Sequence, residues 1–201
     1  MDTILRTPFD EQAIRDLRAG DTVYITGSVF TARDQAHQVL LQAAHGGEGL
    51  PFHPEEMAMF HCGPVMQKEA SGWNVVSAGP TTSIRMEVFE AEFLHTYSTR
   101  LIIGKGGMGA RTLEALSDVG AVYTHFTGGA GALAARAIHR VTGVHWLEEL
   151  GMPEAMWLFE VERFGPLLVT MDARGNDLYK DLAVLIADNM KKIYVRINEE
   201  A

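Results

Sequence analysis

Three short segments each place a cation soon after an apolar stretch that has the composition of a strand. The cations are Arg33, Arg85 and Lys105. Loops that follow strands often converge at one edge of the sheet in α/β folds. Arginine binds carboxylates and phosphates through two parallel hydrogen bonds. The three segments together therefore predict a site for a small polyanion, and the pattern does not choose between a carboxylate and a phosphate.

The first segment runs from Thr31 to His37 and is typical of the start of a helix. Thr31 is predicted as the N-cap, with Asp34 in the capping-box position. Arg33 falls in the first turn, where the helix dipole disfavours a cation, so we expect its guanidinium to face an anion or a carboxylate. His37 follows four residues later and therefore lies on the same face of the helix.

The second segment, Ser77 to Glu87, contains a Gly-Pro turn and then three hydroxyl residues in a row at positions 81–83. Only one of these hydroxyls can cap the following helix, so at least one is free for a ligand. Arg85 again lies in a first helical turn. The alternative for Arg85 is a surface ion pair with Glu87 or Glu90.

The third segment, Gly104 to Gly109, satisfies the pattern G-x-G-x-x-G. A dinucleotide-binding fold needs an acidic residue about 20 positions further on, at the end of the next strand. Neither Asp nor Glu stands there, so a nicotinamide-binding oxidoreductase is only a weak alternative. The segment instead predicts a flexible turn that offers amide N–H groups and Lys105 to an anion, unless Lys105 is a solvated loop residue.

The remaining candidate ligands are sparse. His53, His61 and Cys62 lie close in sequence, but their spacing fits no standard metal site, and we predict that this chain binds no metal by itself. Cys62 is the single cysteine. It cannot form a disulfide within the chain or assemble a cluster that needs several thiolates, so any such cofactor must come from a partner. Met156 and Trp157 are interpreted as core or partner-facing residues.

The composition limits the possible functions. The 201 residues carry a net charge of −9, which argues against binding nucleic acid. No apolar run approaches the roughly 20 residues that a membrane span needs. The first residues lack the apolar core and cleavage site of a secretory signal, so we expect a cytoplasmic protein without a membrane partner.

Strands are predicted to alternate with helices along the chain. We expect strands at 21–27, 73–78, 100–104, 121–126, 156–161 and 167–171. We expect helices at 10–17, from 31 onward, and at 83–97, 112–116, 132–141 and 179–190, with a loop at 45–54. This alternation predicts one α/β domain over residues 1–201 with a largely buried sheet.

The same segments resemble those of the beta-type iron–sulfur hydro-lyases, namely the class I fumarate hydratase C-terminal domain and the tartrate dehydratase beta subunit. The matching strings lie at 26–34, 77–86, 104–109, 128–129, 150–155 and 172–179. Thr-Ala-Arg-Asp and Gly-Pro-Thr-Thr-x-x-Arg-Met are together specific. The resemblance covers about Thr7 to Tyr179 and implies a swivelling β/β/α-type domain.

The resemblance also implies a cofactor and a partner. In this family a [4Fe–4S] cluster is held by three cysteines of a separate alpha region, which leaves one iron open as a Lewis acid. The single Cys62 agrees with this division. We therefore expect a hetero-oligomer with a cluster-carrying alpha subunit, and a homodimer through this chain is a further option.

The resemblance assigns roles to residues of the three segments. Arg33, Arg85 and Lys105 would bind the carboxylates of a small dicarboxylic acid and stabilise the negative charge that develops when a neighbouring proton is removed. The residues assigned to catalysis are Thr81, beside the reacting carbon, and Asp34 and His37, which orient Arg33 or Thr81. The resemblance also implies a proton-abstracting role for Thr81, although an unassisted threonine hydroxyl is a poor base near neutral pH.

The predicted activity is the reversible hydration of fumarate to L-malate, a hydro-lyase reaction. The first alternative is the beta subunit of L(+)-tartrate dehydratase, since L-malate and L(+)-tartrate differ by one hydroxyl group. The second alternative is a non-catalytic anion-binding module. The presence of all four residues Arg33, Thr81, Arg85 and Lys105 argues against such a module.

Overall fold

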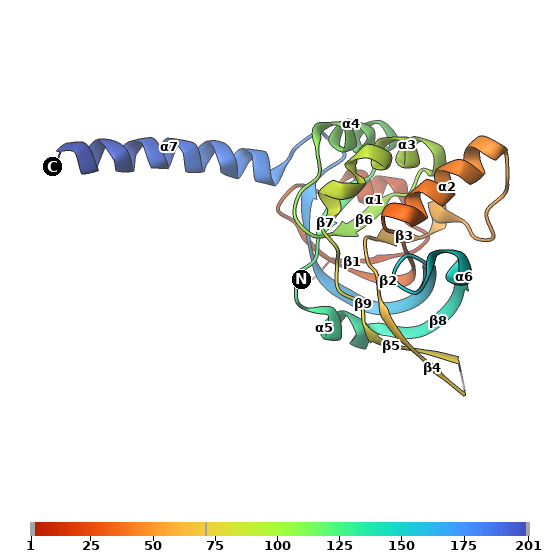
Figure 1. Ribbon diagram of the computed structural model, residues 1–201. Helices are drawn as coiled ribbons and strands as arrows, with labels where there is room; N and C mark the ends of the chain where they lie inside the picture. Colours follow the sequence, from red (N-terminus) through yellow and green to blue (C-terminus); the bar gives the residue numbers. More distant parts are fainter. Residues whose placement is uncertain (1–2, 71, 200–201) are drawn as a thin grey trace.

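The computed structural model describes residues 3–70 and 72–199, most of whose helices pack against a mixed β-sheet (Figure 1). Its main sheet has seven strands in the order β1-β2-β3-β6-β7-β9-β8. These strands are β1 (Thr3–Arg6), β2 (Thr22–Thr31), β3 (Ala58–Phe60), β6 (Leu101–Gly104), β7 (Val122–His125), β8 (Ile138–His145) and β9 (Met156–Met171). A second sheet contains only β4 (Val65–Glu69) and β5 (Gly72–Ser77).

Strand β9 closes the main sheet on itself. It runs antiparallel to β7 and β8 and also to β2. The strands β2, β3, β6 and β7 are mutually parallel neighbours, so their carboxyl ends lie at the same edge. The segments that begin with Ala32, His61 and Lys105 all leave the sheet at this edge.

Alternation along the strands divides the apolar side chains between two cores. Phe60, Ile103 and Val122 belong to one buried cluster, and their sequence neighbours Met59, Ile102 and Tyr123 belong to the other. This period of two is expected for strands that are buried on both faces. The second cluster packs beneath three helices, α2 (Asp34–Gly46), α3 (Glu87–Tyr97) and α4 (Ala110–Val119), which Figure 1 shows together over one side of the sheet.

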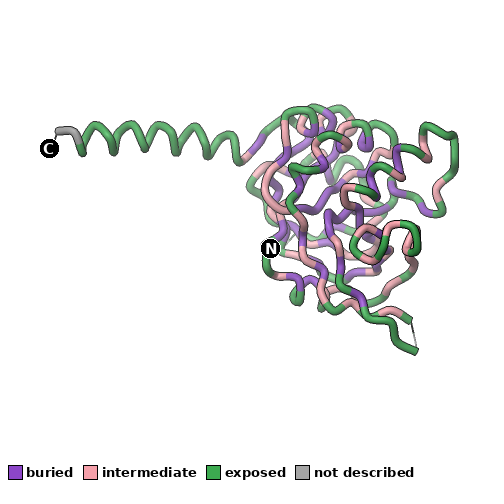
Figure 2. The backbone as a smooth tube through the Cα atoms, in the orientation of Figure 1, coloured by how far each residue is buried: buried purple, intermediate pink, exposed green. Residues whose placement is uncertain are grey.

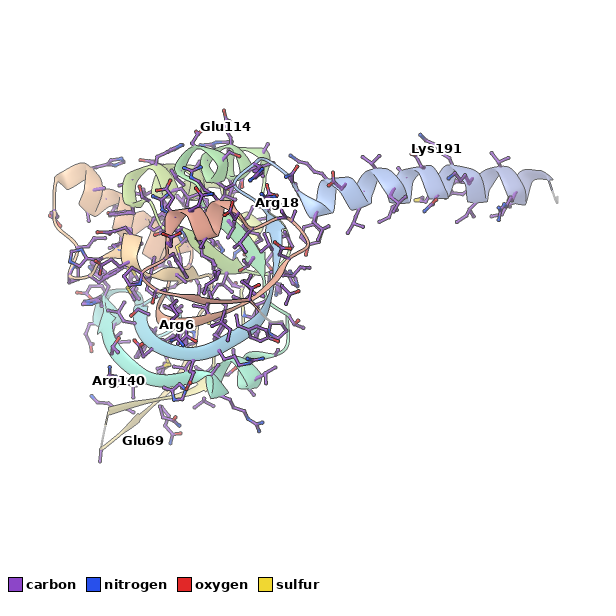
Figure 3. The ribbon with its side chains drawn as sticks, turned by 180° about the vertical axis from the view of Figure 1, so that it is seen from behind. Arg6, Arg18, Glu69, Glu114, Arg140 and Lys191 are labelled. Carbon is purple, nitrogen blue, oxygen red and sulfur yellow. The ribbon has the colours of Figure 1, made fainter. Side chains whose placement is uncertain are left out.

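The remaining helices are short, apart from the last. They are α1 (Glu11–Arg15), α5 (Gly131–Arg136), α6 (Leu147–Leu150), α7 (Leu178–Glu199) and the 3₁₀ helices η1 (Pro54–Glu56) and η2 (Ser83–Met86). Helix α7 projects away from the domain (Figure 1), and Figure 2 shows it as almost entirely exposed. Figure 3 shows Lys191 on this projecting helix. No helix among residues 3–70 and 72–199 has the length and apolar content needed to cross a bilayer.

Two predicted elements are wrong. Thr31 is the last residue of β2 and not the N-cap of the next helix, because its hydroxyl donates to the Ala155 carbonyl and accepts from the Trp157 amide across the sheet. The N-cap position is held by Arg33, whose side chain makes no capping bond. The helix predicted at 132–141 ends at Arg136, since the following residues form strand β8 and pair with β9.

Candidate functional site

The second and third predicted segments are joined by backbone hydrogen bonds. The Ser83 amide donates to the Lys105 carbonyl at 3.1 Å, and the Lys105 amide donates to the Ser83 hydroxyl at 3.0 Å. The Thr81 amide donates to the carbonyl of His61 at 2.8 Å. Strand β5 lies outside the main sheet, so these bonds are what bring its following turn, from Ala78 onward, to the sheet edge.

The first and second segments are joined by an ion pair. The Arg85 guanidinium (Nη2) lies 2.5 Å from Asp34 Oδ2. This contact rules out the expected alternative, in which Arg85 pairs with Glu87 or Glu90. Arg33 Nε lies 3.2 Å from Glu154 Oε1, so Arg33 does face a carboxylate. The structure thus brings Arg33, Arg85 and Lys105 into one connected region.

Two polar groups at this edge form no hydrogen bond or ion pair with the described residues. Among residues 3–70 and 72–199, neither the Lys105 ammonium nor the Thr81 hydroxyl has an ion-pair or hydrogen-bond partner. Both residues are partly exposed. The turn amides are less available than expected, because Gly106 N–H donates to His125 and Gly109 N–H donates to Glu87. An anion would therefore be bound mainly by side chains.

Glycine at position 63 allows Arg33 to lie close to the backbone. A Cβ atom on Gly63 would lie 2.5 Å from Arg33 Nη1 and 2.7 Å from the Pro153 carbonyl oxygen. Both separations are far below van der Waals contact, and the second involves backbone that cannot move aside easily. The residue at position 63 therefore controls where the Arg33 guanidinium lies.

Replacing Gly63 with alanine is expected to displace Arg33 and to lower the free energy of unfolding by roughly 1–3 kcal/mol through overpacking. Any activity that depends on the Arg33 cation should fall on the order of tenfold or more, because the cation is misplaced. Steady-state kinetics and thermal unfolding would measure both effects. The matched control is Gly49→Ala, since a Cβ there meets nothing within 4 Å; equal losses in both variants would contradict this account.

Behind the three cations lies a group that we call the buried triad, made of His37, His61 and Glu90. All three side chains have no exposed surface. Glu90 Oε2 lies 3.0 Å from His61 Nε2 and 3.5 Å from His37 Nε2, close enough for ion pairs, although neither contact has the geometry of a hydrogen bond. The other ring nitrogen of His37 lies 2.8 Å from the Arg33 carbonyl oxygen, and that of His61 lies 2.9 Å from the Ser83 hydroxyl.

The surroundings of the buried triad shift the three pKa values in different directions. Burial favours neutral forms throughout, but contacts with the Glu90 carboxylate outweigh it at His37 and raise that pKa. Burial prevails at His61, whose pKa is lowered. Burial also opposes ionisation of Glu90, yet the two imidazoles outweigh it and lower the pKa of Glu90. Relative to the free side chains, these shifts favour the ionised form of Glu90, the charged form of His37 and the neutral form of His61.

Of the candidate metal ligands considered in the sequence, only His61 belongs to a group of residues that could hold a metal cation. The ligand atoms of His37, His61 and Glu90 lie within 4.8 Å of one another. His53 is instead exposed and pairs with Glu55, while burial raises the pKa of the Cys62 thiol strongly. One buried thiol does not fit a [4Fe–4S] cluster, which needs at least three such ligands, so the structure of this chain offers no cradle for that group.

Several contributors to the site are absent from the predictions. Glu90 lies in the helix predicted at 83–97, three residues before the buried Phe93 and therefore on the apolar face. A carboxylate on the apolar face of a helix needs a partner, and this was the signal available in the sequence. His61 and Ser83 had no such signal. Glu154 lies within one of the strings that carry the family resemblance, but its contact with Arg33 spans 121 positions of the chain.

Comparisons with known proteins match nearly the whole chain. The fumarase C-terminus family matches residues 2–182. The putative L(+)-tartrate dehydratase subunit beta of Methanocaldococcus jannaschii is 43% identical over 186 residues, covering 92% of each chain. The L(+)-tartrate dehydratase subunit beta of Escherichia coli K12 is 40% identical over 199 residues, covering 99% of this chain and 97% of the relative.

A third relative is a longer protein. The putative fumarate hydratase class I of Geobacillus stearothermophilus is 42% identical over 179 residues, which cover 89% of this chain and 34% of the relative. This chain therefore spans about a third of that protein.

The fold and the site define a class of protein, an α/β domain with three cationic side chains on connected segments at one edge of its sheet. More particularly, the chain belongs to the fumarase C-terminus family. The relatives above are hydro-lyases by name, and this chain is a component of a hydro-lyase.

Proposed function

We propose that this chain is the beta subunit of a class I fumarate hydratase and that it binds the carboxylates of fumarate and L-malate. The observation that carries the proposal is the joining of Arg33, Arg85 and Lys105 through direct contacts between their segments. Three cations on a chain of net charge −9 suit a dianion. L(+)-tartrate is the alternative substrate, because the relatives named as beta subunits are tartrate dehydratases.

The two arginines retain free donors for a substrate. A guanidinium has five N–H groups, and each arginine contacts one carboxylate of the protein through one nitrogen. Asp34 and Glu154 therefore hold the two guanidinium groups in place and leave most of their N–H groups for a substrate. Charge that develops on a substrate carboxylate during proton removal would be stabilised by cations already in position, which is the arrangement that favours the transition state.

Thr81 supplies the hydroxyl that would lie beside the reacting carbon. Its amide is fixed by the His61 carbonyl, whereas its hydroxyl has no partner among the described residues. Asp34 is suited to orient Arg85. The ring of His37 is completely buried, so we assign it an orienting role behind the site and no direct contact with substrate.

We further propose that a separate alpha subunit completes the enzyme and holds the [4Fe–4S] cluster. This chain lacks the ligands for such a cluster, and its relatives are named as beta subunits. Helix α7 offers a surface for that partner. Its apolar residues are largely exposed, and exposed apolar patches of this size commonly mark interaction sites. They include Leu182, Ile186, Met190, Ile193 and Ile197.

Two observations favour the alpha subunit at this surface. The family match ends at residue 182, near the start of α7. The alignment with the L(+)-tartrate dehydratase subunit beta of E. coli covers 99% of the chain. It therefore includes nearly all of helix α7, most of which lies outside the family match.

The substrate is tested with the complex of this chain and its partner subunit, purified without oxygen and assayed in parallel on fumarate, L-malate and L(+)-tartrate. We expect kcat/KM to be highest for fumarate and L-malate. A higher value for tartrate would assign the alternative activity. Dicarboxylate binding without turnover on any of the three acids would favour the non-catalytic module.

A further inference from the structure

The buried triad contacts two of the three segments that supply candidate substrate-binding residues and reaches the third through Ser83. The His37 ring bonds to the Arg33 carbonyl oxygen. The His61 carbonyl accepts from Thr81 N–H, and its ring bonds to the Ser83 hydroxyl. Ser83 in turn accepts from Lys105 N–H. Glu90 connects the two imidazoles, so one carboxylate at the centre reaches all of these segments within two or three contacts.

The partners of the rings fix where the protons lie. Both nitrogens of His37 face groups that only accept hydrogen bonds, a carbonyl oxygen and a carboxylate, so His37 carries two protons. His61 Nε2 also faces the carboxylate and carries a proton. Its Nδ1 then accepts from the Ser83 hydroxyl, whose oxygen accepts from Lys105 N–H. The hydrogen bonds from Lys105 through Ser83 to His61 therefore run in one consistent direction.

The charges of this arrangement balance. An imidazolium on His37 and a carboxylate on Glu90 sum to zero in a region without exposed surface, whereas an unpaired buried charge would cost several kcal/mol. A divalent cation bound by two neutral imidazoles and one carboxylate would leave a net positive charge there. Among the described residues no fourth ligand joins the three. The proton-linked state is therefore the better description of the buried triad.

We propose that the buried triad, acting through Ser83, is a positioning cluster that sets the relative placement of Arg33, Thr81 and Lys105 for the reaction. The inference rests on the proposed function for its catalytic consequence. None of its members touches the substrate. Its effect is geometric, since a displacement of about 1 Å in a group that acts on the transition state can cost a factor of about 100 in rate.

The test uses the complex with the partner subunit and two variants. Glu90→Gln removes the central charge, and Ser83→Ala cuts the path between His61 and Lys105 while all three residues of the buried triad remain in place. We expect each variant to lower kcat at least about tenfold, with a smaller change in KM. The double variant should be no slower than the slower single variant, because both substitutions interrupt the same path.

A second readout does not depend on activity. Amide hydrogen exchange, measured by mass spectrometry, should accelerate in segments 79–85 and 103–109 of both variants. The matched control is Asp172→Asn, the same acid-to-amide change at a buried carboxylate that bonds to Ala19, Arg174 and Asn176. It should leave exchange in both segments and kcat unchanged.

The outcomes separate the proposals. Normal kcat and normal exchange in folded Ser83→Ala would overturn the positioning role, and this variant decides the matter if Glu90→Gln does not fold. One bound metal ion per chain that is lost in Glu90→Gln would overturn the proton-linked description. If the unsubstituted complex were inactive on all three acids, the proposed function would fail, while the exchange data would still test the positioning cluster.

Discussion

Replacing Arg85 with alanine should lower kcat/KM by about 10²–10³, which corresponds to about 3–4 kcal/mol of lost transition-state stabilisation. The guanidinium is held by Asp34 and keeps free donors for a carboxylate. Its removal deletes a cation and leaves Asp34 as an uncompensated negative charge facing an anionic substrate. Both changes disfavour charge that develops on the substrate carboxylate, so kcat should fall as well as substrate affinity.

Folding should change little in this variant. The Arg85 side chain is 44% exposed, and ion pairs at exposed sites contribute roughly 0–1 kcal/mol. The control is Arg15→Ala, which breaks an exposed pair with Glu11 on α1 and should leave turnover unchanged. Kinetics of the assembled complex and a thermal melt measure both quantities. Near-normal turnover in a fully assembled Arg85→Ala complex would remove Arg85 from the site.

Replacing Thr81 with valine should lower kcat by about 10²–10⁴, the range expected when a group that transfers a proton is removed. Valine has nearly the same shape as threonine, so the loss would report the hydroxyl itself. Thr81→Ser keeps the hydroxyl and should recover most of the activity. Substrate affinity should change much less than turnover in both variants.

The adjacent Thr82 provides the control for this experiment. Thr82 is exposed, and its side chain makes no capping bond. Thr82→Val should therefore retain normal kcat, measured on the same assembled complex. A Thr81→Val enzyme with a turnover close to normal would exclude proton transfer by this hydroxyl and would limit Thr81 to a packing role.

The sequence predicted the parts of the fold that local pattern encodes. The apolar runs at 100–104 and 121–126 are strands, as expected, because short buried strands bounded by turns have a clear signature. Strand β3 has only three residues, too few for any periodicity to emerge. The helix predicted at 132–141 failed because an alanine-rich start favours a helix, while Ile138, Val141 and Val144 form a strand that pairs with β9.

The contacts that build the site are long-range and could not be predicted from local pattern. Arg85 pairs with Asp34, which lies 51 positions earlier in the chain. The position of the turn at Thr81 depends on a hydrogen bond to the carbonyl of His61, which follows the unpredicted strand β3. The types of the three cations did indicate an anion site. Their mutual placement depends on the closure of the sheet by β9 and on the buried triad, and both join residues distant in sequence.

The central claim is that this chain completes a hydro-lyase whose cluster is held by a partner. The most direct measurement is an anaerobic assay of the purified chain alone, of the cluster-loaded partner subunit alone, and of the two combined, with fumarate, L-malate and L(+)-tartrate as substrates. We predict turnover only in the combined sample. Turnover by this chain alone, or none in the combined sample on any of these acids despite a loaded cluster, would contradict the account.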